Sequence, residues 1–317
     1  MSSSACSSSA AQAAAASPAP ARRPSPAPVL CLALAGLLWG TGGFSGTLLG
    51  HVASLSPLAI AAYRLAVGGG LIGVVLLATG RRLPRSRAAY LRVGLIGLLT
   101  AIYQASYFAA VTLTSVSLAT LITIGSSPVI VLAVETITGR RRLDRVVVIT
   151  LVLALAGLGL LVGLPTGALG TAALLGGAGL AVLSATCFGT MSLACAAPVA
   201  GLDELTTTGV GFSIGGALLL CVALPTVGVG FAPTPAALGL VTFLGLVPTA
   251  IAYVSYFRGL SAAGPGTAAL LALLEPLVGS FLAALFLHDR LGAAGWFGAV
   301  LLMVAVALAG RMANRQR

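Results

Sequence analysis

Apolar segments of about 20 residues follow one another from residue 29 to residue 310, and only short loops separate them. A helix of this length spans the hydrocarbon core of a bilayer. Because that core holds no water to bond the backbone, a spanning segment of this length must form its hydrogen bonds within one helix. Only 7% of the residues are charged, against about 25% in soluble proteins. We therefore predict an all-α polytopic membrane protein with ten transmembrane helices.

The placement of arginine predicts the orientation of these helices. With a cytoplasmic N-terminus, ten helices put fifteen of the 17 basic residues into cytoplasmic loops and tails. Arg290 is then in an external loop and Arg64 is inside the second helix. Because cytoplasmic loops are enriched in basic residues, we predict a multi-pass protein of the cytoplasmic (plasma) membrane with both termini cytoplasmic. We expect residues 1–28, rich in Ser, Ala and Pro, to be a disordered tail, and residues 311–317 to be a basic cytoplasmic tail.

Two stretches of the chain, residues 107–143 and 255–291, resemble each other. At one offset they share Pro128 with Pro276, Arg142 with Arg290 and Leu143 with Leu291, and the triplets at 39–41 and 188–190 match at nearly the same offset. We predict two five-helix repeats, the first at 29–145 and the second at 174–310. Because five is odd, the second repeat must be inverted relative to the first.

The second repeat carries one carboxylate, Glu275, in the middle of an apolar run. A charge at this depth costs about 2.5–3.5 kcal/mol, so we interpret Glu275 as a site for a substrate ammonium group or a proton. The alternative is a structural carboxylate held by hydroxyl groups of neighbouring helices. Pro276 follows directly and has no backbone N–H, so we expect it to kink the ninth helix and leave the carbonyl of Ala272 free. Pro128 is expected to kink the fourth helix in the same way.

Further polar and aromatic residues lie inside the predicted helices. Arg64 suits a carboxylate or phosphate if it faces a cavity, although its long stem also allows it to reach an interface. Together with Glu275, the residues that we predict to line a substrate cavity are Arg64, Trp39, Tyr103, Gln104, Tyr107, Ser127, Tyr253 and Tyr256. For each of them singly, the alternative is an interfacial belt or a hydrogen bond between helices. We expect Glu135 to form an interface ion pair near Arg140.

Other function classes find little support in the sequence. The arginine clusters show no basic helix face interleaved with aromatic residues, so no nucleic acid partner is expected. The five cysteines have no metal-type spacing, and we predict no metal and no cofactor. The pattern Gly-Phe-Ser-Ile-Gly at 211–215 lies within a predicted helix rather than on a strand-to-helix turn, which argues against an esterase nucleophile. We therefore expect the protein not to be an enzyme.

Several segments of residues 29–310 resemble the EamA-like transporters of the drug/metabolite transporter (DMT) superfamily. They are LLWGTGGF, SPLAIAAYR, YFAAVTLTSVSLATLI and YFRGLSAAGPGTAALLALLEPLVG with the LHDRL that follows it. The triplet Leu274-Glu275-Pro276 and the final HDRL are the most specific of these elements. The resemblance implies a ten-helix bundle with a central cavity for amino acids, other metabolites or drugs. The first repeat departs from the family pattern, since Arg141 stands where an acid is common and Ser127 stands opposite Glu275.

From these observations we predict a secondary membrane transporter that works by alternating access. Its partners are the lipid bilayer and a small-molecule substrate, an amino acid-like solute or a drug, and the predicted direction is export. Protons are a candidate coupling ion. The chain contains no phosphate-binding loop of the G-x-x-x-x-G-K type, so an ion gradient would have to supply the energy. The alternatives are a channel and a membrane protein that does not transport.

Overall fold

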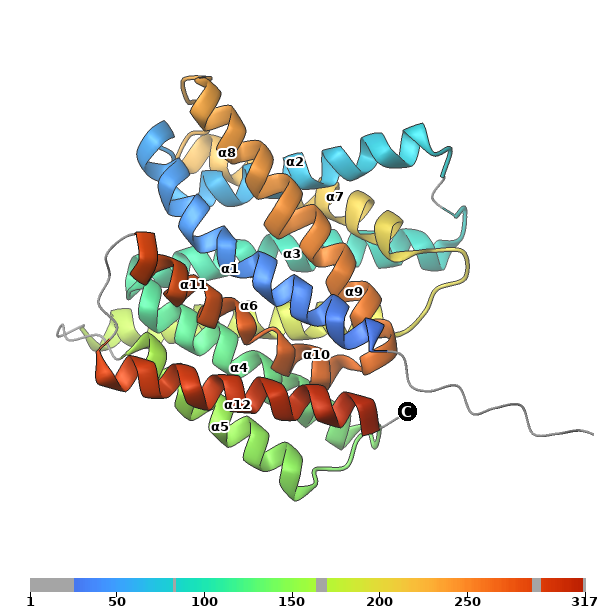
Figure 1. Cartoon of the computed structure of the whole chain (residues 1–317). Coiled ribbons are helices and arrows are strands. Elements are labelled where there is room, and N and C mark those ends of the chain that lie inside the picture. The colour runs from blue at the N-terminus through green and yellow to red at the C-terminus, as the bar shows by residue number, and fades with distance from the viewer. Residues whose placement is uncertain (1–25, 82–83, 164–169, 287–291, 316–317) are drawn as a thin grey trace, which may run out of the picture.

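The computed structural model describes residues 26–81, 84–163, 170–286 and 292–315, with side chains up to residue 312 in the last range. The described chain is a helical bundle whose helices form ten candidate membrane spans (Figure 1), as the sequence predicted. Residues 1–25 of the predicted N-terminal tail, the last residues of the basic tail, and the HDRL segment with Arg290 lie outside the described residues.

The first five spans are single helices: α1 (Ala27–Ala53), α2 (Pro57–Ala78), α3 (Arg87–Leu113), α4 (Val116–Ile137) and α5 (Arg145–Val162). In the second half α6 (Thr171–Ala196), α7 (Glu204–Thr226) and α12 (Ala293–Arg315) are also single helices. The eighth span joins α8 (Pro235–Gly245) to α9 (Ala252–Ala263) through a π-helical segment, η1 (Leu246–Ile251). The ninth span is broken into α10 (Pro265–Leu271) and α11 (Leu274–Phe286).

Short polar side chains fix where many of these helices begin. Each accepts a hydrogen bond from the backbone N–H three residues later, which satisfies one of the donors that a helix leaves unpaired at its N-terminus. The capping residues are Ser56, Ser86, Ser115, Asp144, Asp203 and Thr234. A cap of this kind stabilises a helix by about 1 kcal/mol, so the loops themselves specify the starts of these spans.

The helix contacts follow the two-repeat architecture. The second helix of each repeat packs against its counterpart, α2 against α7, and so does the fifth, α5 against α12. The packing of α3 on α6 has its equivalent in the packing of α9 on α1, and the packing of α4 on α6 in that of α11 on α1. The structure is therefore built from two five-helix halves, and an odd number of spans gives the halves opposite orientations in the membrane, as predicted.

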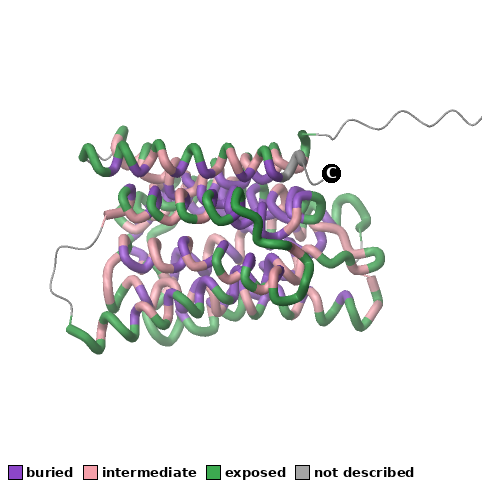
Figure 2. The backbone as a smooth tube through the Cα atoms, turned by 90° about the horizontal axis from the view of Figure 1, so that it is seen from below, coloured by how far each residue is buried: buried purple, intermediate pink, exposed green. Residues whose placement is uncertain are grey.

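The outer surface of the bundle is apolar. Large hydrophobic side chains such as Leu77 and Ile137 are more than four-fifths exposed. In Figure 2 the buried residues lie on the helix faces that turn toward the interior, and exposed residues follow the outer faces. An exposed apolar surface of this extent suits lipid rather than water.

Glycine allows α2 and α7 to approach backbone to backbone. A Cβ atom on Gly69 would lie 2.7 Å from Ser213 Oγ and 2.9 Å from the Phe212 carbonyl carbon. On the facing helix, a Cβ atom on Gly216 would meet the backbone of Ala66. Small residues that permit such close approach stabilise helix pairs in membranes through van der Waals contact, so this seam holds the two repeats together.

We expect the substitution Gly69→Ala to destabilise the protein by about 1–3 kcal/mol, because the added methyl group overlaps α7. The measurement is the unfolding temperature of the purified protein in detergent. The matched control is Gly70→Ala on the same helix, where an added Cβ atom meets nothing within 4 Å. Equal unfolding temperatures for the two variants would contradict the proposed role of this seam.

Candidate functional site

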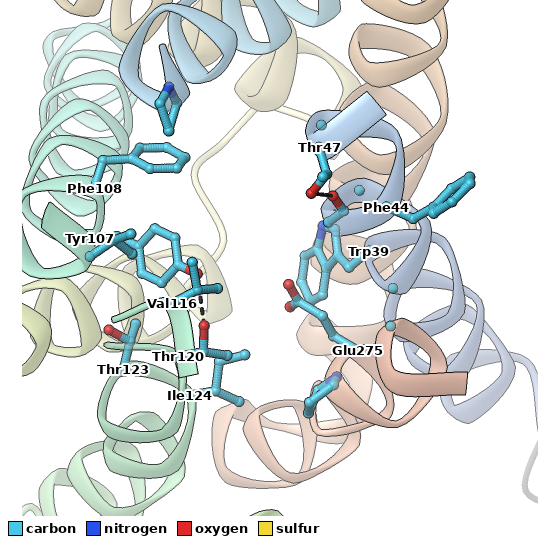
Figure 3. A pocket seen from close by; sticks show the side chains of 18 of the residues that line it. Trp39, Phe44, Thr47, Tyr107, Phe108, Val116, Thr120, Thr123, Ile124 and Glu275 are labelled. Carbon is cyan, nitrogen blue, oxygen red and sulfur yellow. Dashed lines mark hydrogen bonds between the residues drawn. The ribbon is translucent and has the colours of Figure 1, made fainter. Parts of the chain in front are cut away.

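A cavity of about 620 Å³ lies between the two repeats (Figure 3). Most of its wall comes from the C-terminal halves of α1 and α3, the N-terminal halves of α2 and α4, and α11, and the end of α5 and Leu244 of α8 complete it. These are the helix ends away from Ala27 and Met312, so the cavity opens toward the face opposite the two chain termini. Its volume lies within the range of about 300–1,000 Å³ found for small-molecule sites.

Glu275 projects into this cavity from the first turn of α11 (Figure 3). Among the described residues, the ion pairs with N···O distances up to 4.0 Å are Arg81–Asp203 and Arg141–Glu135. Glu275 is thus not neutralised by a direct ion pair within the described part of the chain. Its carboxylate remains accessible to a ligand in the cavity.

The helix break before Glu275 corrects one prediction. We expected a kink that leaves the Ala272 carbonyl free, but the Glu275 N–H donates to this oxygen over 3.0 Å. The Leu273 N–H donates to the Leu270 carbonyl over 3.3 Å, so the Ala269 carbonyl loses its usual helical donor instead. The prediction was wrong because Ala272 and Leu273, between α10 and α11, form a tighter turn and shift the unpaired oxygen along the chain. Pro128, in contrast, lies within a continuous α4, and its predicted kink stays a prediction.

Arg64 lines the same cavity and is held by the π-helical segment of the eighth span. Its Nε donates to Thr249 Oγ1 over 3.1 Å, and its Nη2 donates to the Pro248 carbonyl over 3.3 Å. The Thr249 hydroxyl donates in turn to the Leu244 carbonyl over 2.8 Å. Arg64 belongs to the first repeat, and these bonds to a hydroxyl and a carbonyl of the second repeat fix the direction of its guanidinium.

Four further predicted residues line the cavity: Trp39, Tyr103, Gln104 and Tyr107. Figure 3 places Trp39 beside Glu275 and Tyr107 on the facing wall. The Tyr107 hydroxyl is 2.8 Å from Thr120 Oγ1, while the buried Trp39 Nε1 has no hydrogen-bond partner in the described protein. The cavity is therefore aromatic with a few polar groups, the composition typical of small-molecule sites.

The structure brings Tyr253 and Tyr256 under the cavity rather than into its lining. Both rings pack 4.9 Å from the Trp39 ring, and the Tyr256 hydroxyl is 2.9 Å from Ser192 Oγ. Together with Phe188 they form an aromatic floor below Glu275. Ser127 does not line the main cavity either, and instead lines a second, smaller one next to Glu275.

Sequence reasoning missed several parts of the site. Thr120 and Thr123 line the cavity, and Pro248 and Thr249 position Arg64. Pro248 and Thr249 could have been found from the sequence, because a proline inside an apolar span disturbs the helical hydrogen bonds around it. Gly43 of α1 also lines the cavity, and a Cβ atom added to it would meet nothing within 4 Å.

Polar contacts between the repeats hold the opposite face of the bundle together. Arg141 lies 3.9 Å from Glu135 and donates to Thr267 Oγ1 of α10 over 3.4 Å. The partner of Glu135 is therefore Arg141 rather than the neighbouring Arg140, and the pair is buried, with both side chains less than a tenth exposed. The predicted ion pair of Glu135 is therefore present, and its partner is Arg141 because the chain turns after α4 and brings Arg141 back over the helix end.

A second contact of this face joins Arg81, after α2, to Asp203, before α7. Partial burial would raise the pKa of Asp203, but hydrogen bonds from Thr206 and the Arg81 guanidinium outweigh it and hold this pKa below its ordinary value. The pair is exposed to solvent, so it contributes at most about 1 kcal/mol. The Arg92 side chain adds a hydrogen bond of 2.9 Å to the Ala197 carbonyl. The face that carries the termini is thus closed.

Comparison with known proteins agrees with this architecture. The family model described as "EamA-like transporter family" matches residues 27–163 and again residues 175–311. The protein named "Uncharacterized transporter YwfM" from Bacillus subtilis (strain 168) is 31% identical over 290 residues, which cover 91% of this chain and 95% of that protein. A solved structure titled "Crystal structure of protein" shares the fold with a TM-score of 0.76 at 22% identity, over 92% of this chain and 98% of that one. With both halves matched, the chain belongs to the EamA-like transporter family.

Proposed function

We propose that this transporter is a secondary carrier that exports a small zwitterionic, amino acid-like solute across the cytoplasmic membrane by alternating access. The observation that carries the proposal is the pair of opposite charges, Glu275 and Arg64, that line one cavity without a direct ion pair. A carboxylate suits the ammonium group of the solute, and a guanidinium suits its carboxylate by two parallel hydrogen bonds. Six aromatic and aliphatic wall residues suit its apolar part: Trp39, Phe44, Tyr103, Tyr107, Phe108 and Ile124.

Ligand selectivity tests this proposal directly. A thermal-shift screen on the purified protein would compare zwitterionic amino acids with amines that lack the carboxylate and acids that lack the amine. We expect zwitterions to raise the unfolding temperature most. Counterflow in proteoliposomes should then be saturable for the solute so identified. A flux that does not saturate would indicate a channel and would contradict the carrier.

The proposed orientation places both termini in the cytoplasm, because the basic loops lie on the face of the termini. In that orientation the cavity opens to the outside, as in an exporter after transport to the external face. Reporter fusions at residue 1 and residue 317 should both report the cytoplasm. Fusions that report opposite sides would contradict the two-repeat carrier.

Alternating access requires the closed face to open, so α10 of the second repeat must part from the buried Arg141–Glu135 pair of the first repeat. A Cβ atom on Gly266 of α10 would overlap Glu135 Oε2 and lie 2.9 Å from Arg141 Nη1, so α10 sits directly on this pair. Glu135 Oε2 and two Arg141 nitrogens have no hydrogen-bond partner in the described protein. The hydrogen bond that joins this pair to α10 is the long one from Arg141 to Thr267, at 3.4 Å, and a bond this weak suits a contact that must break in each cycle.

We expect Glu135→Gln to loosen this face, because it leaves the Arg141 charge buried without its carboxylate, at a cost of about 3–5 kcal/mol for a well-formed pair. Hydrogen–deuterium exchange should become faster in α10 and at the end of α4, and stay unchanged in α2 and α7. The matched control is Arg140→Gln, which removes the exposed neighbour. Equal exchange in the two variants would contradict the role of the pair.

A further inference from the structure

A second cavity of about 30 Å³ lies next to the main one and shares Glu275, Tyr103, Thr123 and Ile124 with it. Its other walls include Ser127 of α4 and Ala269 and Ala272 of the broken ninth span. A space of this volume holds one particle of the size of a water molecule. We call it the small chamber.

Ser127 is the first observation that indicates a ligand there. Its side chain is 5% exposed, and its hydroxyl has no hydrogen-bond partner in the described protein. Other buried hydroxyls of the spans donate to backbone carbonyls, among them Ser45, Thr100, Ser106, Thr150, Ser184 and Ser192. Leaving a buried hydroxyl unpaired costs about 1–3 kcal/mol, so a partner in the small chamber would remove a real penalty.

The helix break is the second observation. Because the Leu273 N–H donates to Leu270, the Ala269 carbonyl lacks its helical donor, and the Ala272 carbonyl has a second lone pair beyond its bond to Glu275. Both residues line the small chamber. Carbonyls of an interrupted transmembrane helix are the groups that coordinate Na⁺ in other carrier folds.

Glu275 adds the negative charge. The residues that line the small chamber thus bring a carboxylate, a hydroxyl without a hydrogen-bond partner and two alanines of the broken helix whose carbonyls have free lone pairs, beside apolar side chains such as Phe188 and Ile124. No side chain among them carries nitrogen or sulfur. Oxygen ligands of this kind suit hard cations. With a single carboxylate and space for one particle, a small monovalent cation fits better than a hydrated divalent one.

We propose that the small chamber is a Na⁺ site formed by Ser127, Glu275 and the carbonyls of Ala269 and Ala272. This inference deepens the proposed function, because Glu275 then faces the cation on one side and the solute ammonium group on the other. A bound Na⁺ neutralises the carboxylate and weakens its hold on the solute. By linkage the solute weakens Na⁺ binding by the same factor, which is the coupling that exchange of Na⁺ for an exported solute requires.

The test measures Na⁺ binding without any solute. Purified protein is titrated with NaCl against choline chloride at constant ionic strength and pH, and both the unfolding temperature and ²²Na⁺ binding are recorded. We expect a saturable rise in unfolding temperature with Na⁺ and saturable ²²Na⁺ binding. Because the loss of one ligand to a charge is worth about tenfold or more, Ser127→Ala should weaken binding at least to that extent. Ser126→Ala, the neighbour on α4 that lines neither cavity, should bind like the wild type.

Three outcomes would overturn the Na⁺ site. Equal unfolding temperatures in Na⁺ and choline would indicate a chamber that holds only water. Unchanged ²²Na⁺ binding in Ser127→Ala, or displacement of ²²Na⁺ by K⁺ as effective as by unlabelled Na⁺, would also contradict it. A solute titration in choline chloride separates this inference from the proposed function. Solute binding without any Na⁺ effect would reject the cation site alone. Saturable Na⁺ binding without zwitterion binding would reject the proposed substrate class alone.

Discussion

Replacement of Glu275 by Gln is expected to abolish transport while the protein still inserts and folds. Gln has nearly the same shape, so the helix break and the cavity remain, but the negative charge that faces the solute is lost. Truncation of one partner of a buried charge pair costs about 2–5 kcal/mol or more, which corresponds to a loss of about 30-fold or more in affinity. The measurement is solute flux into proteoliposomes, with size-exclusion chromatography and the unfolding temperature as tests of folding.

The matched control for Glu275 is Glu204→Gln, at the start of α7 and outside both cavities. It removes the same charge from the protein and should transport like the wild type. Glu275→Asp retains the charge on a shorter side chain and should keep part of the flux. Wild-type flux in Glu275→Gln would show that this carboxylate only stabilises the structure, and it would remove the main support for an ammonium site.

The spans could be predicted from sequence because the bilayer imposes length and apolarity on every helix that crosses it. The repeat could be predicted because Pro128 and Pro276 recur at equal distances from other shared residues. The backbone around the prolines could not be predicted. Pro276 removes one donor, but the way the preceding turn pairs again depends on how α11 packs against Gly36 and Gly40 of α1, where added Cβ atoms would meet Leu274 and Val278.

Six of the nine predicted site residues lie around the main cavity, for a physical reason. An ionisable side chain at membrane depth must avoid lipid, so Arg64 and Glu275 had to face the interior of the bundle. Tyr253 and Tyr256 carry no such constraint. Their spacing places them on one face of α9, but only the packing of α9 against α1 decides that this face lies under Trp39 rather than in the cavity.

The substitution Arg64→Ala is expected to weaken solute binding by about 10²-fold, since a hydrogen-bonded charge pair in a buried site is worth 2–5 kcal/mol or more. Arg64→Lys should recover only part of this loss, because an ammonium group cannot donate the two parallel hydrogen bonds of a guanidinium. Isothermal titration of the solute identified in the thermal-shift screen would measure both. Arg64 also anchors the π-helical segment, so a structural effect must be separated from the loss of a binding group.

Two comparisons make this separation. Thr249→Val removes the acceptor of the Arg64 Nε hydrogen bond and leaves the guanidinium in place, so it should weaken binding much less than Arg64→Ala. An amine analogue without the carboxylate should bind Arg64→Ala and the wild type with equal affinity. Glu275→Gln, in contrast, should bind this amine more weakly than the wild type does, and should bind an acid analogue without the amine as well as the wild type does. This crossed pattern assigns each charge of the solute to one side chain, because the two effects are independent only if each residue holds a different group. If Arg64→Ala lost the amine and the zwitterion equally, Arg64 would act on the shape of the cavity rather than on the carboxylate.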